Sequence, residues 1–414
     1  MATVTRRIGL SLGADHCWPL CYEAVMRRLD LSIPVSKKDV AKFEVERVSI
    51  EPWDLAQPVK YDVVLDRITH WYHTSREWVK KAVVANDVYV LNNPWSIQAC
   101  EKNTTYAAMM RLGFPVPRTF MVPPKDYDWT ADLRITLKRY AKLFDVGAVG
   151  REVGFPVFIK PYDGGAWVGV TKADDEAALR AAYEQSGKRV MHVQKAVAPF
   201  DLFVRCIGLG AETRIIRYDA DQPLHARYTT DRDFMPEDQL QVMRDMTLTI
   251  NAFFGWDFNS CEVLRQDGGL FPIDFANACP DSQVTSLHYH FPWLVKANVK
   301  WSVYCAATKK KPNWNLDWEP FFKIAAKDLP FREKLTQYAK IAHTRLETDK
   351  YRDFCDKHLR HVDEVVWEFF ATEEAKDAVR GKVAILFPAH EVEQFTEHFW
   401  AQIQKWRNEE GRPS

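Results

Sequence analysis

The sequence predicts a mixed α/β fold, in which a small parallel α/β domain precedes antiparallel hairpins and a helical C-terminal extension. Strand and helix patterns alternate from the N-terminus to about Pro94, which is typical of a parallel layer. Hairpin signals dominate the middle of the chain, and the segment after Thr308 has helical periodicity. With 414 residues, 47% of them hydrophobic, the chain is long enough for two or three domains with sizeable cores.

The N-terminal region contains the elements of this small parallel layer. Strands are expected at 7–13, 45–50, 61–66 and 88–91, and helices are expected at 21–29 and 75–85. The polar ends of the strands carry Asp15, His16, Arg67 and His70. Ligands of open α/β sheets usually bind beyond the carboxyl ends of the strands, so these side chains are candidate substrate contacts. The alternative is that they are solvated loop residues.

A glycine-containing hairpin follows a short buried strand in the middle of the chain. The strand at 157–159 ends at Lys160, and Asp163, Gly164 and Gly165 come next. Glycines let backbone N–H groups approach a ligand closely, and a lysine beside them can hold phosphate. The pattern is neither a Walker loop nor a dinucleotide fingerprint. It predicts a hairpin lid over a nucleotide, or else an ordinary hairpin whose lysine reaches solvent.

Two acids mark a second hairpin. Strands are expected at 260–264 and 270–277, joined by a tight turn. This pairing places Glu262 and Asp274 on adjacent strands, with Asn277 close by. Two carboxylates and an amide oxygen are hard ligands that suit Mg²⁺, and a cation would relieve the repulsion between the like charges. The alternative is an acidic hairpin whose charges are paired with arginine or lysine.

Further elements are expected between these motifs. They are helices beginning at Lys102 and spanning 133–143, 174–184 and 236–254, strands at 119–122 and 190–195, a linker at 196–201, and a hairpin formed by 202–209 and 213–219.

Charge and cysteine content narrow the classes of function. Lys+Arg and Asp+Glu both number 56, so the net charge is +0, which argues against nucleic-acid and membrane-surface partners. The 8 cysteines form no Cys-x-x-Cys pair, as expected of free thiols in a reducing cytoplasm. No apolar run approaches the roughly 20 residues of a membrane helix, and the N-terminus lacks a signal-peptide pattern.

The order of these motifs resembles the ATP-grasp superfamily, and it is most similar to the glutathione-synthetase-like and D-alanine ligase-like members. The resemblance covers about 92–282 and uses Lys102, Lys160 with its glycine loop, the strand ending in Gln194, and the acidic hairpin. It implies a pre-grasp domain at 1–94, a two-part ATP-grasp domain with antiparallel sheets at 95–301 hinged near 194–201, and a helical extension at 302–414.

The resemblance also implies a role for each matching residue. Lys102 and Lys160 match the lysines that contact nucleotide phosphates. The segment from Asp163 to Gly169, which includes Gly164 and Gly165, matches the flexible loop that covers the phosphates. Gln194, Lys195 and Val197 match the strand that meets adenine, and Asp201 matches the acid that holds the ribose. Glu262, Asp274 and Asn277 match the Mg²⁺ ligands.

Such enzymes are ATP- and Mg²⁺-dependent ligases that activate a carboxylate as an acyl phosphate, which an amine then attacks. The implied cofactors are therefore ATP and Mg²⁺, and the implied partners are a small-molecule carboxylate and an amine. Two alternatives stay open, namely an ATP-grasp kinase of small molecules and a nucleotide-binding scaffold without catalysis.

This chain departs from the family pattern at three places. The second metal strand has Asp274-Phe-Ala-Asn277 in place of Glu-x-Asn, and Trp167 stands where small residues are common. Ser260 replaces an arginine that some members carry two residues before the first metal acid. The cation that stabilises the acyl phosphate must then come from elsewhere, and Arg214, Arg217 and Arg227 are the candidates, each of which could equally be a surface ion-pair partner. Lys160 joins Arg214 and Arg227 as a catalytic candidate.

The extension carries an aromatic stripe near its end. Val392, Phe395, Phe399, Ile403 and Trp406 repeat at helical spacing. Three roles are open for this segment: packing on the preceding domain, a homo-oligomer contact, or the wall of a substrate tunnel.

Overall fold

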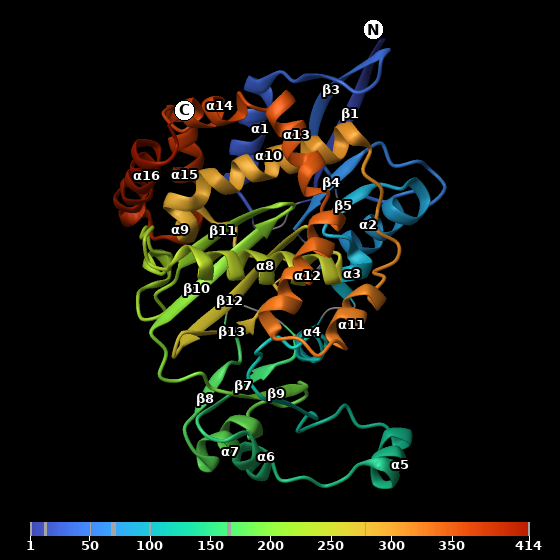
Figure 1. Cartoon of the computed structure of the whole chain (residues 1–414), viewed down its shortest axis with the longest axis vertical. Coiled ribbons are helices and arrows are strands. Elements are labelled where there is room, and N and C mark those ends of the chain that lie inside the picture. The colour runs from blue at the N-terminus through green and yellow to red at the C-terminus, as the bar shows by residue number, and fades with distance from the viewer. Residues whose placement is uncertain are drawn as a thin grey trace. The chain divides into compact units, whose positions relative to one another are not determined.

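The computed structural model describes residues 2–11, 15–49, 51–67, 72–98, 101–163, 167–277 and 279–412. As Figure 1 shows, parallel and antiparallel sheets combine with many helices, and the last part of the chain is entirely helical. The fold class is therefore the mixed α/β arrangement that the sequence predicts.

The strands lie mainly in the first two thirds of the chain. They are β1 Ala2–Ser11, β2 Ser32–Pro34, β3 Asp39–Arg47, β4 Val63–Asp66, β5 Tyr89–Leu91, β6 Thr119–Val122, β7 Val157–Pro161, β8 Thr171–Ala173, β9 Met191–Lys195, β10 Leu202–Leu209, β11 Glu212–Arg217, β12 Phe258–Gln266 and β13 Gly269–Asp274.

The helices alternate with the strands at first and then replace them. They are α1 Cys17–Leu29, α2 His73–Asn86, α3 Pro94–Gln98, α4 Lys102–Arg111, α5 Ala131–Tyr140, α6 Val146–Val153, α7 Glu176–Glu184, α8 Glu237–Phe254, α9 Val284–Leu287, α10 Phe291–Thr308, α11 Glu319–Ala325, α12 Phe331–Arg345, α13 Thr348–His358, α14 Val362–Phe369, α15 Glu373–Leu386 and α16 Val392–Glu409. Short 3-10 turns occupy Leu224–Ala226, His288–His290 and Ala389–Glu391.

The backbone contacts divide the chain into two units. Unit 1 comprises 1–98, 205–260 and 278–414, and unit 2 comprises 99–204 and 261–277. Each unit is described below by itself.

Unit 1 contains a five-stranded sheet of order β2-β3-β1-β4-β5. Strands β3, β1, β4 and β5 are parallel, and β2 joins the edge in the antiparallel direction. The strands β4 and β5 consist mainly of apolar residues, as expected of buried parallel strands. Val64 and Val90 of these strands pack in one core with Trp78 and Val79 of α2. The parallel layer predicted for the N-terminal region is confirmed.

The helical C-terminal segment is packed into unit 1. Helix α10 is buried along nearly its whole length and contacts β1 and β4 as well as α1, and α14 and α15 also contact α1. The Tyr22 hydroxyl of α1 lies 2.8 Å from the Ser302 hydroxyl of α10. In the aromatic stripe, Phe399, Ile403 and Trp406 are buried, as core packing requires.

Unit 2 contains the antiparallel sheet β6-β9-β7-β8. One face is covered by α6 and α7, which lie beside each other in Figure 1. Val157 and Ile159 of β7 alternate with Lys160 and pack in a core with Val193 and Leu179. A further sheet has the order β11-β10-β12-β13, of which β11 and most of β10 belong to unit 1. Its β12–β13 pair is the predicted acidic hairpin.

Several element boundaries differ from the sequence prediction. The expected strand at 45–50 is the end of the longer β3. Strand β1 begins at Ala2, and this start was not predicted because the polar residues Thr3, Thr5 and Arg6 leave few apolar residues to mark it. Helix α6 was not predicted, because Gly147 and Gly150 lower helix propensity. A Cβ at Gly150 would lie 2.5 Å from the Leu179 side chain, so close packing requires glycine there.

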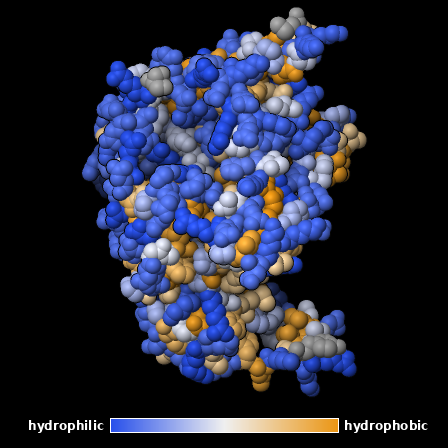
Figure 2. Space-filling view, viewed as in Figure 1, coloured by the Kyte–Doolittle hydropathy of each residue, from blue (hydrophilic) through white to orange (hydrophobic). Residues whose placement is uncertain are grey.

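The surface is predominantly polar. On the face seen in Figure 2, hydrophilic residues dominate and hydrophobic residues are scattered or form small groups. Among the helices that the structure describes, none combines the length and the apolar character needed to cross a membrane.

Gly210 provides a test of the packing in unit 1. Its φ is +57°, and a Cβ there would lie 2.2 Å from the Trp301 ring. We therefore expect Gly210→Ala to lower the free energy of unfolding by about 2–4 kcal/mol, through overpacking and backbone strain together. Urea denaturation followed by tryptophan fluorescence measures the change.

Gly268→Ala is the matched control. Gly268 also has a positive φ, +76°, but nothing lies within 4 Å of a Cβ at that position. It should lose only about 1 kcal/mol. Equal losses at both positions would contradict the packing explanation.

Candidate functional site

The acidic hairpin in unit 2 brings its two carboxylates together. Glu262 of β12 and Asp274 of β13 are directly opposite each other in the antiparallel register, and the register shifts between Glu262 and Val263. Directly opposed residues have Cβ atoms about 4.5–5.5 Å apart. Glu262 is buried and Asp274 is partly buried, so a cation close to this pair is needed to offset their repulsion.

Lys102, the first residue of α4, supplies such a charge. Its Nζ lies 2.5 Å from Asp274 Oδ2, and its side chain is 7% exposed. Burial alone would lower the pKa of Lys102, but the carboxylates of Asp274, Glu262 and Asp163 together outweigh burial and raise that pKa. Burial likewise acts to raise the pKa of Asp274, and Lys102 and Lys160 outweigh it and hold that pKa below the ordinary value. Both groups are therefore charged at neutral pH.

Lys160, at the end of β7, reaches the same hairpin. Its Nζ donates to the Ile273 carbonyl at 3.1 Å and to the Tyr106 hydroxyl at 3.4 Å. Burial, reinforced by the neighbouring Lys102 charge, lowers the pKa of Lys160 to about 8 although Asp274 and Glu262 oppose the shift. The positive charge of Lys160 is less well neutralised by nearby carboxylates than the charge of Lys102, so an added anion would stabilise the charged form of Lys160.

Two aromatic residues that the sequence reasoning missed complete the cluster. Tyr106 of α4 donates its hydroxyl proton to the Ile273 carbonyl at 2.8 Å, and its ring meets the His192 ring edge to face at 5.3 Å. Burial and the two lysines lower the pKa of His192 to about 2, so the ring is neutral. Neither ring nitrogen of His192 has a hydrogen-bond partner among the described residues. His192 is brought to the cluster by the strand pairing, because it lies opposite Lys160 across β9 and β7.

Glu262 and Asp274 provide carboxylate oxygens of the kind that bind divalent cations. Asp274 Oδ1 is buried and has no hydrogen-bond partner among the described residues, so it is a free hard ligand. Groups of three or more His, Cys, Asp or Glu side chains with metal-site geometry do not occur in the described part of the chain. Since Mg²⁺ is usually bound by one or two carboxylates plus ligand phosphates, the donor set remains suitable.

The other predicted nucleotide contacts belong to unit 2 and have varied partners. Asp163 is exposed, and Gly164 and Gly165 lie outside the described residues. Gln194 donates to the Thr119 hydroxyl at 3.0 Å, and Lys195 donates to the carbonyls of Gly154 and Phe155 at 2.8 Å.

The next two predicted contacts follow at the end of β9 and in the linker. Val197 is buried. Asp201 pairs with Arg265, which donates to it at 2.6 Å. A ribose hydroxyl would therefore have to share Asp201 with this arginine.

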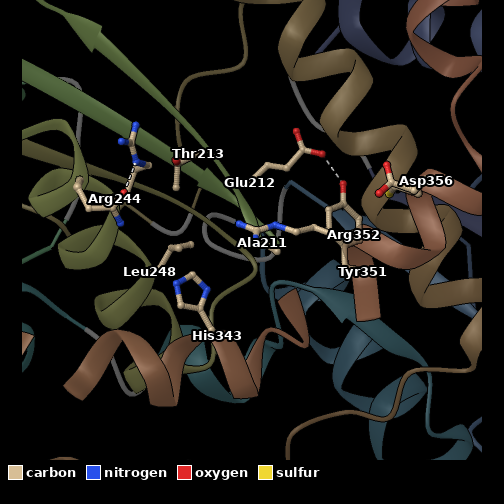
Figure 3. Close-up of a pocket in the computed structure, with 11 residues that line it drawn as sticks. Ala211, Glu212, Thr213, Arg244, Leu248, His343, Tyr351, Arg352 and Asp356 are labelled. Atoms are coloured by element: carbon tan, nitrogen blue, oxygen red, sulfur yellow. Dashed lines mark hydrogen bonds between the residues drawn. The ribbon is translucent and has the colours of Figure 1, made fainter. Parts of the chain in front are cut away.

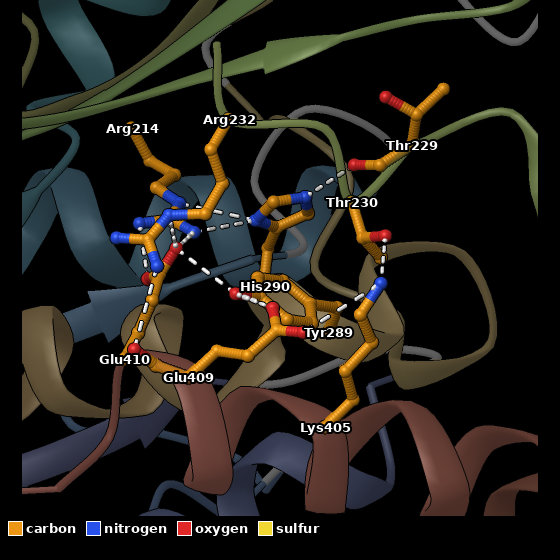
Figure 4. A network of polar contacts seen from close by, with 9 residues as sticks. All are labelled: Arg214, Thr229, Thr230, Arg232, Tyr289, His290, Lys405, Glu409 and Glu410. Carbon is orange, nitrogen blue, oxygen red and sulfur yellow. Dashed lines mark hydrogen bonds and ion pairs between the residues drawn. The ribbon is translucent and has the colours of Figure 1, made fainter.

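The predicted catalytic arginines lie in unit 1, where their guanidinium groups already have partners. Arg214 Nη1 lies 2.8 Å from Glu410 Oε2, as Figure 4 shows. Arg214 also donates to His290 Nδ1 at 3.1 Å, and burial together with the Arg214 charge holds the pKa of His290 well below its usual value. The neutral ring then donates from Nε2 to the Thr229 carbonyl at 2.8 Å. Arg214 is thus part of a clamp on the C-terminal helix.

The remaining arginine candidates are bound locally. Arg227 donates to the Gln222 carbonyl at 2.9 Å and to the Tyr218 hydroxyl at 3.4 Å, and Arg217 pairs with Asp231 at 2.9 Å. Of the residues at the strand ends, Asp15 and Arg67 are buried and paired with each other, and His70 lies outside the described residues.

A separate cavity of about 550 Å³ lies in unit 1 (Figure 3). It contains none of the predicted site residues. Its lining is Ala211, Glu212, Thr213, Gln241, Arg244, Leu248, His343, Tyr351, Arg352, Cys355 and Asp356. Both signs of charge face it, and Glu212 accepts a hydrogen bond from the Tyr351 hydroxyl, so the cavity favours no single class of ligand.

The pKa of Lys160 predicts a pH dependence of stability. The unfolded lysine titrates near 10.5 and the folded one near 8, so between these values the unfolded chain binds more protons. The contribution of Lys160 to the free energy of unfolding therefore rises between about pH 8 and pH 10.5, by up to about 1.4 kcal/mol per pH unit. Lys160→Met should lose the rise. Urea unfolding of both proteins from pH 7.5 to 10.5 measures it, and parallel curves would refute the shift.

The Arg214 clamp predicts a stability loss at the C-terminal helix. Glu410→Gln removes the charge that faces Arg214, and we expect about 1–3 kcal/mol of destabilisation by thermal or urea unfolding. Glu393→Gln is the control, because Glu393 is 67% exposed and pairs with Arg380 on the surface. That variant should change stability by less than about 0.5 kcal/mol. Similar effects of both variants would show that the clamp is not specially stabilising.

Comparison with known proteins gives matches at the level of structure. No family model and no curated protein matches the sequence. An ATP-grasp RimK domain protein from Sphaerobacter thermophilus is 17% identical, with a TM-score of 0.45 over 66% of this chain and 92% of that one. A D-alanine–D-alanine ligase from Bacillus anthracis, complexed with ATP, is 13% identical, with a TM-score of 0.47 over 84% and 99%. The VanG D-Ala:D-Ser ligase from Enterococcus faecalis is 12% identical, with a TM-score of 0.47 over 82% and 100%.

Proposed function

We propose that this protein is an ATP- and Mg²⁺-dependent carboxylate–amine ligase of the ATP-grasp type. The observation that carries the proposal is the convergence of Lys102, Lys160, Glu262 and Asp274 from four separate segments of unit 2. Two buried lysines beside two carboxylates form a site that can hold both polyphosphate and a cation.

The two lysines would bind the nucleotide. Lys160, whose charge is poorly compensated by its surroundings, gains most from a phosphate oxygen. Lys102 neutralises Asp274 in the structure described here. In the proposed complex, Lys102 would turn to a phosphate, and Asp274, Glu262 and the Asn277 amide would hold Mg²⁺. The bound cation would supply Lewis-acid stabilisation of phosphate charge.

The proposed reaction has two balanced steps. A carboxylate oxygen of the acid substrate bonds to the γ-phosphorus of ATP while the bond to the leaving ADP oxygen breaks. The amine nitrogen then bonds to the acyl carbon, inorganic phosphate leaves, and the amine loses a proton to form the amide. The chain's contribution is charge neutralisation and alignment, which dominate phosphoryl transfer.

Variants of the cluster test the proposal. Lys160→Met and Asp274→Asn should each reduce ADP release by about 100-fold or more, because each removes a charge that acts on the transferring phosphate. Lys160→Met should also weaken Mg²⁺–ATP binding in calorimetry. Lys125→Met is the control, since Lys125 lies in the same unit and pairs with Glu184 on the surface.

The substrate requirement separates the candidate functions. A ligase releases ADP only when an acid and an amine are both present, a kinase needs one acceptor, and a scaffold binds nucleotide without turnover. If Lys160→Met and Asp274→Asn bound Mg²⁺–ATP as tightly as the unmodified protein, the site assignment would be wrong.

A further inference from the structure

Unit 1 contains a second buried polar cluster, at the carboxyl ends of the parallel strands β1 and β4. Arg67 follows β4 directly, and Asp15 precedes α1 in the connection that follows β1. Arg67 Nε donates to Asp15 Oδ2 at 3.2 Å, and Arg67 Nη2 donates to the Pro280 carbonyl at 2.7 Å. The side chains of Arg67 and Asp15 are only 7% and 6% exposed.

This buried ion pair is only half satisfied. Arg67 Nη1 and Asp15 Oδ1 are buried, and neither has a hydrogen-bond partner among the described residues. A buried polar atom without a partner costs about 1–3 kcal/mol, more when it is charged, and native proteins rarely leave such atoms unpaired. One ion pair therefore carries a donor nitrogen and an acceptor oxygen that lack partners in the part of the chain that the structure describes.

A buried lysine from the C-terminal helices adds positive charge to the cluster. Lys382 of α15 is 3% exposed. Burial lowers its pKa, and the carboxylates of Asp15 and Asp281 oppose that shift, which places all three groups in one electrostatic neighbourhood. Helix α15 passes close to the start of α1, because a Cβ at Gly381 would lie 2.9 Å from His16 Nε2.

The position of the cluster in the fold favours a ligand. In open α/β sheets, ligands bind beyond the carboxyl ends of the strands, and the cluster lies at those ends of two adjacent strands. Arginine offers a planar fork that matches the oxygens of a carboxylate or phosphate. The free acceptor at Asp15 would pair with an O–H or N–H group on the same molecule.

We propose that Arg67, Lys382 and Asp15 form a binding site for a small molecule that carries an oxyanion beside a hydrogen-bond donor. The oxyanion, a carboxylate or a phosphate, faces Arg67 Nη1 and Lys382. The donor group faces Asp15 Oδ1. The site uses no residue of the Lys160 cluster, so the inference does not depend on the proposed nucleotide chemistry.

Calorimetric titration of the full-length protein tests this site. The probes are inorganic phosphate, glycolate and acetate, and each titration is repeated in Lys160→Met to remove any phosphate binding near Lys160. We expect saturable binding of phosphate or of glycolate, and which of them binds identifies the oxyanion. Acetate lacks the hydroxyl donor, so it should bind more weakly than glycolate. Retention of binding in Lys160→Met, even if nucleotide binding is lost there, separates the two sites.

Variants then assign the binding to these side chains. Lys382→Met should weaken binding of the preferred probe about tenfold or more, the loss expected for one charged hydrogen bond. Lys310→Met is the matched control, because Lys310 is a 13% exposed lysine of unit 1 that pairs with Glu347. Asp15→Asn should abolish the preference for glycolate over acetate. Arg67→Met removes the buried positive charge and could prevent folding, so Arg67→Lys is the second variant. It retains the charge but lacks the planar guanidinium group, and it should therefore weaken binding of the preferred probe.

Three outcomes would overturn the proposal. They are an absence of saturable binding for all three probes, equal weakening by Lys382→Met and Lys310→Met, and a crystal structure grown with the preferred probe in which ordered water pairs with both Arg67 Nη1 and Asp15 Oδ1.

Discussion

The ion pair between Lys102 and Asp274 is the interaction on which the candidate site depends. It joins the first residue of a helix to the last residue of a strand far along the chain, and it balances one charge of an otherwise repulsive acid pair. Breaking a buried pair by removing one partner is costly, so the site needs a replacement charge whenever Lys102 moves. A cation accompanied by an anion can provide that replacement, which is why this geometry suits a metal–polyphosphate ligand better than either component alone.

Two ion pairs among the described residues, Lys102–Asp274 and Arg67–Asp15, are constructed in a similar way. In each, one carboxylate oxygen is paired, and the other is buried and has no hydrogen-bond partner within the described ranges, as in Asp274 and Asp15. In each, a second lysine with a lowered pKa lies nearby, Lys160 in unit 2 and Lys382 in unit 1. Incompletely satisfied charge of this kind is expensive for stability and is typical of sites that bind a charged ligand.

Local sequence patterns predicted the elements and the acidic hairpin well. The period-2 pattern and tight turn around 267–269 predicted the opposition of Glu262 and Asp274, because hairpin register follows from the turn. Long-range partners were not predictable: nothing local to Arg214 on β11 indicates that Glu410, the residue after α16, neutralises it. Tyr106 and His192 were missed for the same reason, since their role follows from the pairing of β7 with β9 and from the position of α4. The predicted domain boundaries and the roles of individual residues remain predictions.

The discontinuous makeup of unit 1 has a consequence for biosynthesis. Its three segments, 1–98, 205–260 and 278–414, alternate with those of unit 2, and α1 packs on α10, α14 and α15. A chain emerging from the ribosome therefore exposes the apolar face of α1 until nearly three hundred further residues have been translated, whereas most of unit 2 is complete by residue 204. Such delayed burial is a hazard for aggregation, so the nascent chain would benefit from chaperones that shield its first helix.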